Sequence, residues 1–179
     1  TFTDLGILMV LIIILVFIVM AAQFESLVDP FVIMFSIPFA FTGIVLGLAV
    51  TQTPLGVMAL IGVIMLMGIV VKNGIVLIDY TILCRERGMG IITSVVTAGK
   101  SRLRPVLMTT LTTVLGMIPM AVGTGEGSEM WRSMGMTVAW GLSVSTLITL
   151  IIVPTVYAVF AANGVKRRRR KIRKALRNN

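Results

Sequence analysis

Long apolar runs, joined by short polar connections, dominate this chain of 179 residues and restrict it to one class of fold. A helix that spans the hydrocarbon core of a membrane needs about 20 mostly apolar residues. The chain is 57% hydrophobic and 13% charged, whereas a soluble domain has about 45–50% apolar and about 25% charged residues. We therefore predict an all-α integral membrane protein with five spans and no large soluble catalytic domain.

The five predicted spans differ in length and in what separates them. The second contains Pro38, which is tolerated in a membrane helix because neighbouring groups satisfy the freed carbonyl. The third must tilt or project, because its length of about 45 Å exceeds a hydrocarbon core of about 30 Å. Residues 89–100 have the mixed pattern of an interfacial amphipathic helix. The predicted spans are residues 5–22, 31–50, 55–84, 102–122 and 131–160.

The distribution of Lys and Arg predicts the orientation of these spans. Residues 85–104 hold five basic residues, whereas the connections 51–54 and 123–130 hold none. The C-terminal tail, residues 166–179, holds nine basic residues and no acid, and the rest of the chain is neutral. The positive-inside rule therefore predicts a cytoplasmic tail and an external N-terminus.

Histidine is absent and Cys84 is the only cysteine, which excludes several kinds of site. The chain cannot form a Ser-His-Asp triad, a His-ligated metal centre, an intrachain disulfide or a CxxC redox pair. The apolar run that begins at Leu5 is too long for a signal peptide, and the first residue is Thr. We expect a piece of a longer membrane protein that is not an enzyme and holds no metal.

Lys72 lies deep in the third predicted span, about 12 residues or 18 Å from its inner end. A charged lysine at mid-helix costs about 2.5–3.5 kcal/mol on insertion scales, so we expect it to face protein and have a partner. A functional role is the default, and snorkelling or a structural ion pair is the alternative. Asp79 lies on the same face, about 10.5 Å from Lys72 along the helix axis. It is either a further functional residue, which would pass protons along the helix, or a solvated acid near the helix end.

The fourth predicted span carries a matching polar stripe of Arg102, Thr109 and Thr113, at spacing i, i+7 and i+11. Threonine hydroxyls both donate and accept, so with water they can pass a proton. In membrane helices they more often bond the carbonyl four residues back, and both interpretations stay open. Neither Lys72 nor Arg102 has a buried acid beside it except Asp79, so their carboxylate partners are expected elsewhere in a longer protein.

Two further patterns predict packing and lipid contact. Gly43 and Gly47 form a G-x-x-x-G, which lets another helix approach closely. The basic tail follows a span and has no interleaved aromatic residue, so anionic lipid, at about 1 kcal/mol per basic residue near the surface, is favoured over nucleic acid. The residues predicted to contact lipid are Lys166, Arg167, Arg168, Arg169, Arg170 and Lys171.

Four motifs in one order and spacing resemble a known family of membrane transporters. They are Phe24-Glu25-Ser26, Lys72-Asn73-Gly74-Ile75 with Asp79, the run RLRPVLMT from Arg102 to Thr109, and the run GTGEGS from Gly123 to Ser128. Over nearly all of residues 1–160 the chain resembles the C-terminal membrane segment of resistance–nodulation–division (RND) exporters, the inner-membrane pumps of Gram-negative multidrug efflux. The resemblance implies the last five helices of a twelve-helix core.

The resemblance also implies a mechanism and partners. It implies drug:proton antiport, driven by the proton gradient without a cofactor, and places Lys72, Arg102 and Thr109 in the proton relay. The acidic relay partners are two aspartates on the fourth helix, in the N-terminal half of such a pump, and their protonation releases the lysine and shifts the helices. The implied substrates are hydrophobic or amphiphilic compounds. The implied assembly is a homotrimer in the bacterial inner membrane with a periplasmic adaptor and an outer-membrane channel.

Three other functions share this membrane core and stay open. Exporters of metal ions are one, although a metal path without His would have to use some of the 13 Met, many of which packing explains. Lipid exporters are the second. The third is a membrane accessory of protein translocation, which would differ in its periplasmic domains.

Overall fold

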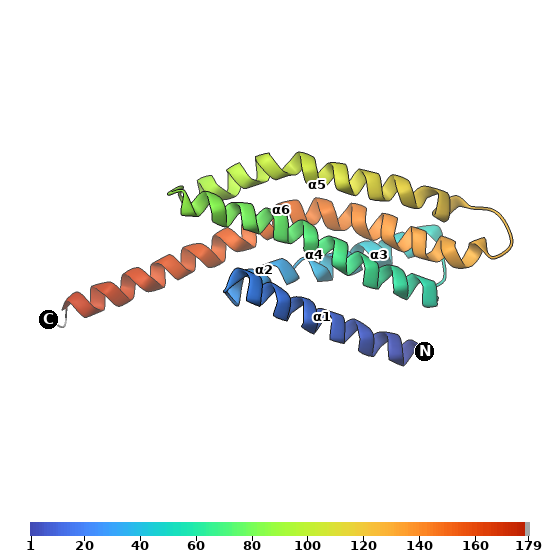
Figure 1. Ribbon diagram of the computed structural model, residues 1–179, viewed down its shortest axis with the longest axis horizontal. Coiled ribbons are helices and arrows are strands. Elements are labelled where there is room, and N and C mark those ends of the chain that lie inside the picture. The colour runs from blue at the N-terminus through green and yellow to red at the C-terminus, as the bar shows by residue number, and fades with distance from the viewer. Residues whose placement is uncertain (178–179) are drawn as a thin grey trace.

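The computed structural model describes residues 1–177 as a bundle of helices, with no strand among those residues (Figure 1). Five segments are long and apolar enough to cross a membrane, with residues 28–51 counting as one. The predicted all-α fold with five spans is therefore confirmed. The helices are α1 (Phe2–Phe24), α2 (Val28–Met34), α3 (Ile37–Thr51), α4 (Val57–Glu86), α5 (Ile91–Val122) and α6 (Ser128–Arg177).

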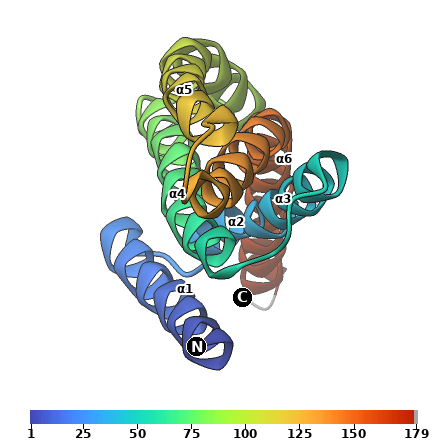
Figure 2. The same cartoon turned by 90° about the vertical axis from the view of Figure 1, so that its right-hand side faces the viewer.

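Helix α6 lies at the centre of the bundle and packs against α3, α4 and α5 (Figure 2). Leu66 of α4 and Val138, Leu142 and Val153 of α6 are completely buried. In a membrane, helices associate through van der Waals packing and through small residues that let backbones approach. Much of the core of this chain thus lies where three helices contact α6, and a further part joins α1 and α2 to α4.

Glycines allow α3 and α6 to lie close together. A Cβ atom added at Gly43 would lie 2.8 Å from the Cβ of Val144, and one added at Gly47 would overlap the side chain of Trp140. Gly141 of α6 also lies at this crossing. The glycines of the G-x-x-x-G therefore lie on the face of α3 that meets α6.

Helix α1 packs little against the rest of the chain. Met20 is its only buried residue, and Figure 2 shows it lying apart from the bundle beside α4. Leu11, Leu15 and Ile18 are each more than half exposed. This apolar surface has to be covered by lipid or by other protein.

The second predicted span, residues 31–50, is divided into α2 and α3 by a break at Phe35 and Ser36. Pro38 explains the position of the break, because its ring clashes with the carbonyl four residues earlier and it has no N–H to donate. That carbonyl belongs to Met34, the last residue of α2. The buried hydroxyl of Ser36 donates to the carbonyl of Ile33 over 2.6 Å and satisfies one group at the break.

The predicted interfacial helix 89–100 and the span 102–122 are one helix, α5. The expected start at Arg102 is therefore wrong, although Pro105 lies only three residues later. Pro105 removes the hydrogen bond to the carbonyl of Ser101, and Ser101 is exposed, so water can take its place. The other spans begin or end a few residues from their predicted bounds, at Phe2–Phe24 and Val57–Glu86.

The predicted span 131–160 and the basic tail also form one helix, α6, which begins at Ser128 and continues to Arg177. Its 50 residues correspond to about 75 Å. No proline follows Pro154, and an isolated glycine such as Gly164 costs only about 1 kcal/mol in a helix. The last part of α6 projects beyond the bundle at the end where α4 turns into α5 (Figure 1). Asn178 and Asn179 of the predicted tail lie outside the described residues.

Candidate functional site

The exposed residues of α4 beyond its first turn form a single stripe along the helix. Their spacing is three, four or seven residues, which keeps them on one face. Every residue between them is buried or half-buried by the rest of the chain. The stripe, hereafter the α4 stripe, consists of Met65, Gly68, Lys72, Asp79, Leu83 and Glu86.

Lys72 lies at the middle of α4, roughly 21–23 Å from either end of the helix. Its side chain is exposed in this chain, and no ion pair to it exists within residues 1–177. Asp79 is exposed on the same stripe and is also without an ion pair in that part of the chain. The predicted partner of Lys72 is therefore not supplied by the described residues.

Arg102 of α5 contacts α4 at Tyr80, close to Asp79. Its guanidinium carbon lies 4.6 Å from the centre of the ring of Tyr80, the residue that directly follows Asp79 in the sequence. The Nε atom of Arg102 is buried and has no hydrogen-bond partner. A cation over an aromatic face is stabilised by about 0.5–2 kcal/mol, depending on its desolvation, so Tyr80 holds this arginine in place.

Three of the four threonines between positions 109 and 113 of α5 bond their own backbone. Thr109 donates to the carbonyl of Pro105 over 3.0 Å, Thr112 to that of Met108 over 2.8 Å, and Thr113 to that of Thr109 over 2.9 Å. Each hydroxyl keeps free acceptor capacity. The common structural role of membrane threonines is thus present here, and it does not prevent Thr109, which is exposed, from accepting a hydrogen bond.

The structure places Arg102, Thr109 and Thr113 on one continuous helix, as their spacing requires. Arg102 and Thr113 are half-buried and Thr109 is exposed. No hydrogen bond or ion pair in the described part of the chain joins Lys72, Asp79 and Thr109 to one another. The candidate site is thus an exposed polar face on two neighbouring helices, and Lys72, Asp79 and Thr109 on it do not bond directly to one another.

Sequence reasoning did not identify Tyr80 or the pair of Thr110 and Thr146. The hydroxyl oxygens of Thr110 on α5 and Thr146 on α6 lie 3.1 Å apart and are buried. An aromatic residue beside Asp79 gives no signal that Arg102 will stack on it, because the two residues lie on different helices. These contacts depend on the crossing of helices, which periodicity does not determine.

The remaining predicted residues lie away from the α4 stripe. Gly43 and Gly47 lie at the crossing of α3 and α6. Cys84 is buried, and residues 1–177 contain no group of three or more His, Cys, Asp or Glu side chains placed to hold a metal ion. The six residues predicted to contact lipid are all exposed on the projecting part of α6: Lys166, Arg167, Arg168, Arg169, Arg170 and Lys171.

Comparison with known families and sequences finds relatives over most of the chain. A family described as AcrB/AcrD/AcrF matches residues 2–161. The swarming motility protein SwrC of Bacillus subtilis (strain 168) is 42% identical over 162 residues, covering 90% of this chain. The multidrug resistance protein MdtC of Erwinia tasmaniensis is 38% identical over 143 residues, 79% of this chain. The cobalt-zinc-cadmium resistance protein CzcA of Cupriavidus metallidurans is 37% identical over 143 residues, 80% of this chain.

The chain spans only a small part of these relatives: 15% of SwrC and 14% each of MdtC and CzcA. Among solved structures, a heavy metal efflux pump matches with a TM-score of 0.79 and 29% sequence identity. That match covers 88% of this chain and 15% of the pump. The same helix arrangement therefore exists as one part of a much larger membrane protein.

Proposed function

Because this chain belongs to the AcrB/AcrD/AcrF (RND) family, we propose that it forms the C-terminal membrane part of a proton-driven exporter. The observation that carries the proposal is the α4 stripe, which presents Lys72 at the middle of a helix long enough to cross a membrane, without a partner in the described residues. A lysine facing lipid there would cost about 2.5–3.5 kcal/mol. The N-terminal half of the same pump is therefore proposed to cover the stripe and to supply carboxylates to Lys72.

The proposed mechanism is electrostatic. Ionised carboxylates hold Lys72, and their protonation weakens that attraction and lets α4 move relative to the covering helices. Arg102 and Thr109 complete the relay on α5. Asp79 extends the α4 stripe toward the end of the bundle at which α4 turns into α5, and Thr113 extends the α5 face toward the opposite end. Protonation of these carboxylates then drives the helix displacement, without a cofactor, and transport rather than a chemical reaction is the result.

Substrate class and assembly are proposed from the relatives. MdtC is named for multidrug resistance, and we propose that hydrophobic or amphiphilic compounds are the substrates. The proposed assembly is a homotrimer in the bacterial inner membrane, with the C-terminus in the cytoplasm and with a periplasmic adaptor and an outer-membrane channel as partners. In this assembly the residues described above handle protons, while other domains of the pump bind the substrate.

A second candidate substrate class is metal ions, which the similarity to CzcA and to a heavy metal efflux pump favours. Growth of cells that express the full-length protein separates the two classes. Increased tolerance to dyes and detergents, without increased tolerance to cobalt, zinc or cadmium, supports the first class. The reverse pattern supports the second, and the proposed relay is common to both.

The test of the relay is export by the full-length protein with Lys72→Ala, compared with Lys100→Ala as a matched control. Lys100 is also exposed, but it lies on α5 away from the α4 stripe. We expect Lys72→Ala to abolish export at normal membrane expression, because the charge that senses protonation is gone, and Lys100→Ala to retain it. Unchanged export by Lys72→Ala would show that Lys72 is dispensable and that the relay is wrong.

A further inference from the structure

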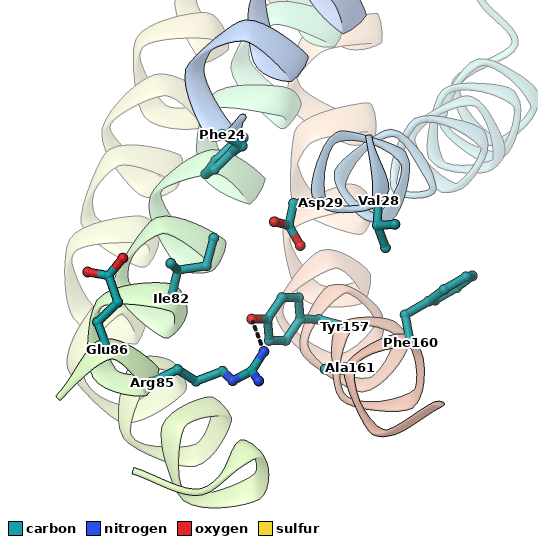
Figure 3. A pocket seen from close by; sticks show the side chains of 9 residues that line it. All are labelled: Phe24, Val28, Asp29, Ile82, Arg85, Glu86, Tyr157, Phe160 and Ala161. Atoms are coloured by element: carbon teal, nitrogen blue, oxygen red, sulfur yellow. Dashed lines mark hydrogen bonds between the residues drawn. The ribbon is translucent and has the colours of Figure 1, made fainter. Parts of the chain in front are cut away.

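A cavity of about 410 Å³ lies at the end of the bundle at which α4 turns into α5 (Figure 3). It is open on one side and is lined by the join of α1 and α2, the last turn of α4, and the part of α6 where the bundle ends. Its polar lining includes Asp29, Arg85 and Tyr157, and its apolar lining includes Phe24 and Phe160, which lie on either side of Asp29 and Tyr157 (Figure 3). This cavity shares no residue with the proposed relay, so a ligand could bind in it whether or not the relay exists.

Arg85 is held in position within the cavity. Its guanidinium donates to the hydroxyl oxygen of Tyr157 over 3.1 Å, and Tyr157 is only 4% exposed. Figure 3 shows Arg85 reaching from α4 across to Tyr157 on α6. A guanidinium offers five N–H donors, and this bond uses one of them. The remaining donors are available to an anion that enters the cavity.

Carboxylates lie near this arginine but form no ion pair with it. Asp29 is half-buried and its side chain points into the space between α4 and α6 (Figure 3), while Glu86 lies at the exposed edge. Within residues 1–177 neither carboxylate has a basic nitrogen within ion-pair distance. Asp29 and Arg85 carry opposite charges in one cavity and lie beyond ion-pair distance of each other, so a ligand between them can pair an anionic group with Arg85 and a cationic group with Asp29.

A ligand that meets both requirements carries a phosphate and an ammonium group a few atoms apart. We propose that the cavity binds a phospholipid whose head group bears a primary ammonium, such as phosphatidylethanolamine. The phosphate would bind Arg85, the ammonium would bind Asp29, and the glycerol and the first acyl carbons would contact Phe24 and Phe160. The cavity lies at the ends of α1 and α4, two helices long and apolar enough to cross a membrane, so we place it at the depth of lipid head groups. A purely anionic head group fits less well, because it leaves Asp29 unpaired.

The experiment is lipid titration of the full-length protein by native mass spectrometry, with phosphatidylethanolamine, phosphatidylcholine and phosphatidylglycerol of equal chain length. We expect phosphatidylethanolamine to bind about tenfold more tightly than the other two, since a hydrogen bond to a charged group is worth about one factor of ten or more. Soluble glycerophosphoethanolamine should compete poorly. If it binds as tightly as the lipid, the cavity is a site for a small zwitterion, and the lipid proposal is overturned.

Two variants with matched controls localise the binding. Arg85→Gln and Asp29→Asn should each weaken phosphatidylethanolamine binding about tenfold. Asp29→Asn should also reduce the difference in affinity between phosphatidylethanolamine and phosphatidylglycerol. Arg87→Gln and Glu25→Gln alter exposed residues outside the cavity lining and should leave binding unchanged. Equal binding of the three lipids by the wild type, or Arg85→Gln that binds like Arg87→Gln, contradicts the proposal.

Tyr157→Phe keeps the shape of the side chain and removes only the hydroxyl that holds Arg85. It should weaken binding less than Arg85→Gln does. Tyr157→Phe tests the role of Arg85 in lipid binding if Arg85→Gln itself unfolds, which circular dichroism in detergent would reveal. A folded Tyr157→Phe protein that binds phosphatidylethanolamine as tightly as the wild type does would show that the position of Arg85 does not matter for binding, and would reject the site.

Discussion

Thr109 and Thr112 of α5 form a natural pair for testing whether a hydroxyl on the polar face serves transport. Both are exposed and both donate to the carbonyl four residues back, so replacing either with valine removes the same local hydrogen bond. We expect Thr109→Val to reduce export by the full-length protein several-fold and Thr109→Ser to preserve it, while Thr112→Val has little effect. Similar losses for both valine variants would assign the hydroxyls to helix structure and remove Thr109 from the relay.

The ring of Tyr80 is a second residue with a specific expected effect. It lies 4.6 Å from the guanidinium of Arg102, and such a contact contributes about 0.5–2 kcal/mol. Tyr80→Phe keeps the ring, so export should be nearly normal, whereas Tyr80→Leu removes the π-face and should lower export roughly two- to thirtyfold by this energy. Proton-coupled export in vesicles would measure this at matched protein levels. Equal activity of the two variants would mean that the stacking does not position Arg102.

At the scale of helices, the crossing of α3 and α6 depends on the absence of side chains at Gly47. A Cβ atom there would overlap Trp140, whereas a Cβ at Gly116 of α5 would meet nothing within 4 Å. Gly47→Ala should therefore destabilise the folded protein by about 1–3 kcal/mol through overpacking. Gly116→Ala should be neutral or stabilising, because alanine is the better helix former by about 1 kcal/mol.

Unfolding of the two glycine variants by a denaturing detergent, followed by circular dichroism, would give the order of their stabilities. The wild type is expected to lie between Gly47→Ala and Gly116→Ala. If Gly47→Ala were as stable as the wild type, the α3–α6 crossing would have to relax freely around an added methyl group. The close approach of these helices would then not be a determinant of the fold.

Hydrophobic length was sufficient to predict five spans, but helix ends depend on individual backbone groups. Pro38 ends α2 at Met34 because it acts on the carbonyl four residues earlier, and the resulting break was not predicted from an apolar run. Arg102 suggested a helix start because charges usually mark span ends, yet α5 passes through it without interruption. The polar face was predictable from spacing, whereas Tyr80 and the Arg85–Tyr157 bond were not, because they join different helices.

At the scale of the whole molecule, charge is concentrated at one end. The turn between α4 and α5 and the projecting part of α6 lie at one end of the bundle. The turns between α3 and α4 and between α5 and α6 lie at the other end (Figure 1). This arrangement is what an alternating five-span topology requires. Placing the basic end in the cytoplasm remains our prediction from the positive-inside rule.

Because α6 continues as one helix into the basic tail, the contribution of each tail residue to lipid binding should decrease along the chain. Each residue lies about 1.5 Å farther along the axis, so Lys174 lies about 12 Å beyond Lys166. The Debye length at physiological salt is about 8 Å, so the attraction to anionic lipid falls to roughly a fifth over that distance. A residue near the surface contributes about 1 kcal/mol.

Two triple variants that remove equal charge test this gradient. Changing Lys166, Arg167 and Arg168 to glutamine should reduce the enrichment of phosphatidylglycerol around the full-length protein in mixed-lipid nanodiscs by up to about 3 kcal/mol in binding free energy. Changing Lys171, Arg173 and Lys174 should have a clearly smaller effect. The ratio of the two effects should grow as salt is raised, because screening shortens the reach of the surface potential. Equal effects would mean that the tail bends to lie along the membrane, since only a helix parallel to the surface keeps all of its charges at one depth.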